Sequence, residues 1–171
     1  MKILSKQKNS RMCMICGLDN EYGVNAPFYN MEDGSVMTVF RYKEQHQSYP
    51  GRVHGGMITA MLDEMGLRSL WAKELSEETF GVTISLDTKY RKPVPYETEL
   101  IGRGVVVKNT SHFIITDSYI MDKEGEILAN GRIKYIKMDT QKIQEGVEVH
   151  EEMPYLVEDG RTEIEGPFFD N

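Results

Sequence analysis

Residues 53–66 read VHGGMITAMLDEMG and begin the one long helix that the sequence predicts. Apolar side chains recur there at spacings of three and four residues, which places them on one face of a helix. The pattern predicts a helix from Gly55 to about Lys73, with a core-facing stripe of Met57, Ile58, Met61, Leu62 and Met65. Such a stripe is typical of plain core, although Met-rich faces also form adaptable pocket walls.

Strands are expected before and after this helix in the sequence. Short apolar and β-branched runs separated by turn residues predict a meander, with strands at 25–29, 35–42, 80–90, 98–107, 112–121 and 126–138. A single long helix cannot be enclosed by two sheets. We therefore expect an α+β fold in which a curved antiparallel sheet of five or six strands wraps the helix.

The chain has 171 residues, which suits one domain, and a net charge of -7 that is unevenly distributed. Residues 1–138 carry +1, whereas residues 139–171 carry -8. We expect a flexible basic arm at 1–11, a globular domain at 12–138, and an acidic extension at 139–171 that packs back through Tyr155 and Phe168-Phe169.

Composition also limits the partners. No broad basic surface for nucleic acid, no membrane span and no secretion signal are apparent, so a cytoplasmic location is expected.

The start of the helix is the first candidate for chemistry. Gly55 and Gly56 leave amide N–H groups accessible where a helix has no internal acceptors, which suits an oxyanion hole or simply a tight turn. Asp63 lies two turns further along the same face, about 10 Å away. Both groups must approach one carbonyl carbon to about 3 Å, so a shared site requires Asp63 from a second copy of the chain.

Cys13 and Cys16 form a single Cys-x-x-Cys pair. One such pair is half of a tetrahedral zinc site, and no second half follows in the sequence. The interpretation we favour is a pair of small buried or free thiols with no metal. The alternatives are a metal half-site completed by a symmetry mate and a redox pair. Glu64 is expected to be a solvated helix carboxylate.

Several segments together resemble the hotdog-fold acyl-CoA thioesterases of the PaaI-like, phenylacetyl-CoA type. His54-Gly55-Gly56, with Asp63 nine residues after the histidine, resembles the HGG-x(n)-D helix of that family. Further resemblance lies in CMICGLDNEYG at 13–23, GVTISLDTKYRKPVP at 81–95 and the closing strand at 124–135.

The resemblance implies roles for individual residues. Asp63 matches the catalytic acid, acting as general base or as nucleophile, and Gly55, with Gly56 beside it, matches the amide that polarises the thioester carbonyl. Thr83 matches a residue that holds the attacking water, although strand alternation turns it away from Val82 and Ile84. His54 is expected to orient the loop, and Ser48 stands where relatives carry a longer polar side chain.

Coenzyme A is implied as part of the substrate, with no separate cofactor, and its phosphates call for nearby cations. The candidates are Arg91, Lys92 and Lys108, with Asn109, Thr110 and Ser111 beside Lys108. The resemblance implies a homodimer with shared sites, or a dimer of dimers. The alternative functions are a non-catalytic acyl-CoA sensor and a hydratase or dehydratase, which would need His46 as its base.

Overall fold

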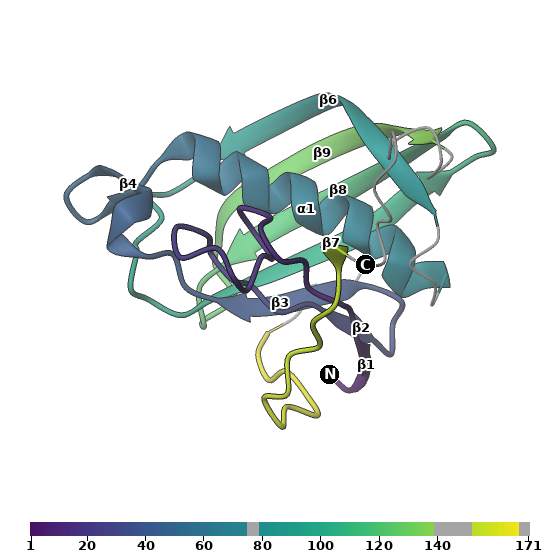
Figure 1. Ribbon diagram of the computed structural model, residues 1–171. Helices are drawn as coiled ribbons and strands as arrows, with labels where there is room; N and C mark the ends of the chain where they lie inside the picture. Colours follow the sequence, from purple (N-terminus) through teal and green to yellow (C-terminus); the bar gives the residue numbers. More distant parts are fainter. Residues whose placement is uncertain (75–78, 139–151, 168–171) are drawn as a thin grey trace.

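The computed structural model describes residues 1–74, 79–138 and 152–167. One long helix lies across the face of an antiparallel sheet, which confirms the predicted α+β arrangement (Figure 1). The sheet has seven strands, one or two more than expected, in the order β1-β2-β3-β7-β8-β9-β6. Its strands are β1 (Ile3–Lys6), β2 (Tyr29–Met31), β3 (Val36–Phe40), β6 (Phe80–Tyr90), β7 (Leu100–Asn109), β8 (Phe113–Met121) and β9 (Ile127–Met138).

Helix α1 (Gly55–Glu74) has the predicted start and ends one residue later than expected. Met61, Leu62 and Met65 are fully buried against the sheet, so the stripe predicted from spacing is the core of the domain. A short 3-10 turn, η1 (Glu44–His46), and a hairpin of β4 (Gln47–Tyr49) and β5 (Arg52–Val53) precede the helix. This hairpin places the loop before the helix beside the helix N-terminus (Figure 1).

Two boundaries predicted from sequence differ from the structure. The first short strand lies at Tyr29–Met31 rather than at 25–29. Residues 1–11, expected to be a flexible arm, contain the edge strand β1 and two buried amides, Gln7 and Asn9. The Gln7 side chain donates to the Arg68 carbonyl at 2.9 Å and accepts from the Arg68 guanidinium at 3.1 Å. Because Gln7 and Arg68 satisfy each other's hydrogen-bonding groups, residues 1–11 pack against the domain despite their positive charge.

The described part of the acidic extension runs beside the N-terminal segment of its own chain (Figure 1). Asn9 and Tyr155 form an antiparallel bridge, and the Tyr155 hydroxyl contacts the Asp19 carboxylate at 2.8 Å. Lys6 pairs with Asp159 at 2.5 Å, and Ile164 is buried in an apolar cluster beneath β1 and β2. The extension therefore packs back through Tyr155, as expected, whereas Phe168 and Phe169 lie outside the described residues.

No helix among the described residues is long and apolar enough to cross a membrane.

Candidate functional site

The first turn of α1 presents one unoccupied amide. His54 occupies the N-cap position, since its carbonyl accepts from the Met57 amide at 2.9 Å. The His54 Nδ1 atom accepts from the Gly56 amide at 2.9 Å. The Gly55 amide has no acceptor within the described ranges of the chain, and it is the first residue of the helix. An oxygen atom bound here would therefore meet the Gly55 N–H at the positive end of the helix dipole.

This arrangement separates the roles of the two glycines. A Cβ atom at Gly56 would lie 3.0 Å from His54 Nδ1, so Gly56 leaves space for the histidine that caps the helix. Its amide is occupied by His54, and the expectation that both glycine amides face a substrate therefore narrows to Gly55. The expected orienting role of His54 agrees with its capping bond.

A cavity of about 600 Å³ opens beside the Gly55 amide. Its wall combines apolar side chains, exposed aromatic rings and three cationic side chains. The Tyr90 hydroxyl contacts the Gly55 carbonyl at 3.1 Å and the Thr59 hydroxyl at 2.7 Å, which joins the end of β6 to the first turn of α1. The lining residues are Ser48, Tyr49, Arg52, Val53, Gly55, Gly56, Ile58, Tyr90, Arg91, Lys92, Pro93 and Val94.

Sequence reasoning identified part of this wall. Ser48, Gly55, Gly56, Arg91 and Lys92 were candidates, and the cavity brings them together. Arg52 and Tyr90 were missed. The signal for Arg52 was its place two residues before His54, and Tyr90 ends the strand that precedes the Arg91-Lys92 pair. Met57, Met61 and Met65 do not line this cavity. Of the two roles considered for the methionine stripe, packing in the core is therefore the one observed.

Two of the three cations predicted for phosphate binding, Arg91 and Lys92, have polar partners in the structure. Arg91 donates through Nε to the Asn130 side chain at 2.7 Å. Lys92 forms an ion pair with Glu126, and both side chains are about half exposed. Exposed ion pairs of this kind contribute little to stability.

Asp63 on α1 and Thr83 on β6 form a second group. The Thr83 hydroxyl donates to Asp63 Oδ1 at 2.9 Å, and the Tyr135 hydroxyl donates to the Asp63 backbone carbonyl at 2.6 Å. Burial raises the pKa of the Asp63 carboxyl above its ordinary value, against the opposing effect of the Thr83 hydrogen bond. Asp63 is half-buried and Thr83 is exposed, so the pair lies at the surface along the β6 edge.

A β-bulge explains how Thr83 reaches Asp63. The pairing of β6 with β9 shifts between Thr83 and Ser85, so that Thr83 lies opposite Tyr135 and Leu86 lies opposite Ile133. Tyr135 and Ile133 both face the core, and the extra residue therefore places Thr83 and Leu86 on the helix side together. Val82 and Ile84 are 44% and 54% exposed, which reverses the expectation from strict alternation.

Other candidates lie elsewhere. Asn109 contacts Glu74 at 3.3 Å, at the C-terminal end of a helix about 30 Å long. Lys108, Asn109, Thr110 and Ser111 are therefore far from Arg91 and Lys92 within one chain. His46 is buried, and its two ring nitrogens contact the Lys43 amide at 3.0 Å and the Tyr22 carbonyl at 2.7 Å.

Comparisons with known proteins agree with this architecture. The sequence model of the thioesterase superfamily matches residues 50–129, which contain most of the cavity wall, α1 and strands β6, β7 and β8. The chain is 24% identical to the acyl-coenzyme A thioesterase THEM4 of Rattus norvegicus over 140 residues, covering 81% of this chain and 57% of the relative. It thus spans little more than half of that relative's length.

Solved structures show the same fold. A crystal structure of a thioesterase superfamily protein superimposes with a TM-score of 0.65 at 25% identity, covering 73% of this chain and 63% of the other. A thioesterase from Ralstonia eutropha described as phenylacetic acid degradation-related gives 0.58 at 18% identity, covering 66% and 85%. The chain therefore has the hotdog fold of these structures, and the thioesterase superfamily is the family whose sequence model it matches.

Proposed function

We propose that this protein hydrolyses acyl-CoA thioesters to the free acid and coenzyme A, in a homodimer whose two sites are shared between protomers. The observation that carries the proposal is the unoccupied Gly55 amide on a cavity bordered by Arg52, Arg91 and Lys92. An amide at a helix N-terminus stabilises an oxyanion, and cations at the cavity mouth suit the phosphates of coenzyme A. The name of the rat relative supports the choice of an acyl-CoA substrate.

The reaction needs a base or nucleophile as well as an oxyanion site. Asp63 accepts a proton from water while the water oxygen adds to the thioester carbonyl carbon, and the Gly55 amide holds the resulting oxyanion. Collapse of this intermediate breaks the C–S bond, and the departing thiolate takes up the proton from Asp63. Direct attack by the Asp63 carboxylate, through an anhydride that water then hydrolyses, is the second route.

One chain does not bring these groups together. Gly55 and Asp63 are eight residues apart on α1, about 12 Å along the helix axis, and Asp63 does not line the cavity beside Gly55. A two-fold axis that runs antiparallel helices past each other would place Asp63 of the partner subunit beside Gly55. The same pairing would bring the Lys108–Ser111 turn of the partner subunit towards this cavity.

The edge strand β6 supports this mode of association. It is the outer strand of the sheet, eleven residues long, and carries exposed Val82 and Ile84. Unpaired apolar edges are unfavourable in an isolated protein and suit pairing with another copy. Sedimentation of the intact protein distinguishes a monomer from the proposed dimer and from a dimer of dimers.

Release of free thiol from a panel of acyl-CoAs tests the activity. The panel includes aryl-acetyl thioesters, because the resemblance to the PaaI-like type favours an aromatic acyl group. Turnover that depends on Asp63 supports the proposal. Binding without turnover would favour an acyl-CoA sensor. A hydratase or dehydratase would need a loop histidine as its base. Both ring nitrogens of the buried His46 are in hydrogen-bond contacts with the backbone, which does not favour this role.

We also propose a cytoplasmic location.

A further inference from the structure

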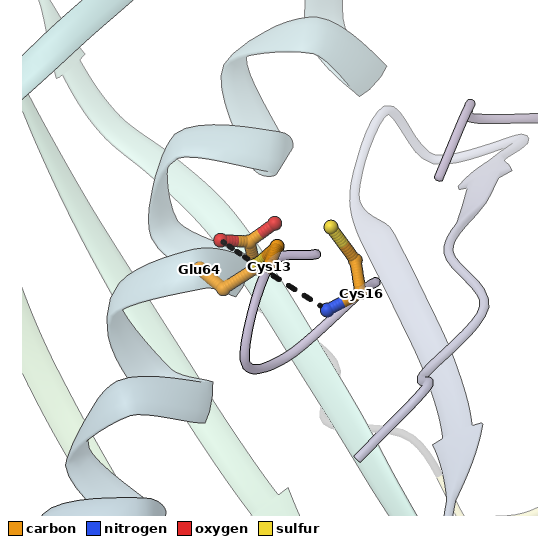
Figure 2. A group of neighbouring side chains, drawn as sticks. All are labelled: Cys13, Cys16 and Glu64. Atoms are coloured by element: carbon orange, nitrogen blue, oxygen red, sulfur yellow. Dashed lines mark hydrogen bonds between the residues drawn. The ribbon is translucent and has the colours of Figure 1, made fainter. Parts of the chain in front are cut away.

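A second chemical cluster lies beside α1 and includes Glu64, the residue that follows Asp63. Cys13, Cys16 and Glu64 each offer a ligand atom, and these atoms all lie within 4.8 Å of one another. Figure 2 shows the two cysteines on the N-terminal loop facing Glu64 on the helix. The two cysteines alone are half of a tetrahedral metal site. The fold brings the Glu64 carboxylate to them as a third ligand group.

The loop is shaped around the Cys13 sulfur. The backbone amides of Ile15 and Cys16 donate to Cys13 Sγ at 3.3 and 3.4 Å, and the Gly17 amide closes the turn onto the Cys13 carbonyl at 2.9 Å. A Cβ atom at Gly17 would lie 2.5 Å from Cys13 backbone atoms, so this tight turn requires glycine. Two N–H groups directed at one sulfur stabilise the anionic thiolate, which is the form that binds a metal.

Glu64 is oriented by its neighbour. Arg68 donates through Nε to Glu64 Oε1 at 2.7 Å, and its side chain is 1% exposed. The other carboxylate oxygen, Oε2, lies 4.0 Å from Cys13 Sγ. Glu64 is therefore not the solvated carboxylate expected from sequence. One of its oxygens is held by a buried arginine, and the other is turned towards the thiols, as in carboxylate ligands supported by an outer hydrogen bond.

We propose that Cys13, Cys16 and Glu64 bind a zinc ion. Zn–S and Zn–O bonds of about 2.3 and 2.1 Å place tetrahedral ligand atoms about 3.6 to 3.8 Å apart, so the observed spacing must close by no more than about 1 Å. Two thiolates and a carboxylate balance the formal charges of Zn²⁺ and the Arg68 guanidinium. Thiolate ligands favour zinc over magnesium or calcium.

The fourth position of the ion has room for water. All three ligand residues border a cavity of about 200 Å³, which is also lined by Ser10, Leu67, Arg68, Trp71, Phe80 and Met153. The Ser10 hydroxyl lies 3.3 Å from Cys16 Sγ. Trp71 is the single tryptophan of the chain, so its fluorescence reports on the same cavity.

Titration of the chelator-treated, reduced protein with Co²⁺ and then Zn²⁺ tests this site. We expect one Co²⁺ per chain with thiolate charge-transfer absorption, its displacement by one Zn²⁺, and a change in Trp71 fluorescence that saturates at the same ratio. Cys13→Ser and Cys16→Ser, which preserve side-chain shape, should each weaken Zn²⁺ binding at least tenfold. Circular dichroism checks that both variants fold.

Two helix variants give a matched comparison. Glu64→Gln should also weaken Zn²⁺ binding at least tenfold, whereas Glu74→Gln, which makes the same change on the same helix away from the cysteines, should leave it unchanged. Absence of a charge-transfer band while both thiols react with a thiol reagent would overturn the proposal. A Cys13–Cys16 disulfide in protein purified with reductant would also overturn it, in favour of a redox pair.

Discussion

The Thr83 hydroxyl donates a hydrogen bond to the Asp63 carboxylate across a distance of 2.9 Å, from the edge strand to the middle of the helix. In the proposed mechanism, the other carboxylate oxygen, Oδ2, takes the proton of the attacking water or attacks the carbonyl carbon itself. The hydrogen bond depends on the bulge between Thr83 and Ser85, without which Thr83 would face away from the helix.

Removing the Gly55 N–H tests the oxyanion role directly. Proline suits the first position of a helix, so Gly55→Pro deletes one amide hydrogen without breaking α1. We expect kcat for thioester hydrolysis to fall by about 10²- to 10³-fold, the usual effect of losing one oxyanion donor. Gly55→Ala adds the same Cβ near the Tyr90 ring and keeps the N–H, so it serves as the control. Equal losses in the two variants would implicate the Tyr90 contact instead.

Mixed dimers test whether the sites are shared. Protomers with Asp63→Asn keep Gly55, and protomers with Gly55→Pro keep Asp63. Random exchange of equal amounts should restore about a quarter of the wild-type sites, because half of the dimers are mixed and each has one complete site. Activity that stays at the level of the parent variants, after exchange is verified with differently tagged chains, would mean that each chain works alone.

Lys92 should act on the coenzyme rather than on the reaction centre. Lys92→Gln is expected to raise KM for acyl-CoA several-fold and to leave KM unchanged for an acyl thioester of N-acetylcysteamine, which lacks the phosphates. Lys123→Gln, on an exposed turn away from the cavity, is the matched charge control. A similar KM increase for both substrates would argue against phosphate binding at Lys92.

Acid should weaken the attachment of the C-terminal segment. Partial burial acts to raise the pKa of Asp159, but hydrogen bonds from Lys6 and Tyr29 outweigh it and lower the pKa to about 2. A carboxyl with a lowered folded-state pKa stabilises the fold above its unfolded pKa near 4, and this contribution is lost as pH falls towards 2. The Tm difference between wild type and Asp159→Asn should therefore be present at neutral pH and close in that range. A Tm difference that stays constant from neutral pH down to pH 2 would contradict this prediction.

The helix and the later strands were predictable because their periodicity is local. Core spacing from Met57 to Met65 and alternation in β8 and β9 need no knowledge of distant residues. Strand β1 was missed because polar partners far along the chain bury Gln7, and composition alone describes that segment as basic and exposed. Only the tertiary contacts of Gln7 show that this segment is part of the folded domain.

The candidate site still rests on a proposal. The HGG sequence and Asp63 indicated the two groups of the proposed chemistry, and the helical rise between them led us to propose a site shared by two chains. Three details emerge only from the structure: the hydrogen bond of the Gly56 amide to His54, the bulge between Thr83 and Ser85, and the approach of Glu64 to Cys13. Each arises from side chains that meet through the fold rather than through sequence spacing.

The rate of free-thiol release from acyl-CoA by wild type and by Asp63→Asn tests whether the Asp63 carboxylate acts on the thioester. Asparagine preserves the shape of the side chain and can still accept the Thr83 hydrogen bond, so the variant removes only the charged oxygen. We expect hydrolysis by the wild type and a loss of at least about 10²-fold in kcat for the variant, the lower range for a lost general base. Equal rates in the two proteins would contradict this expectation.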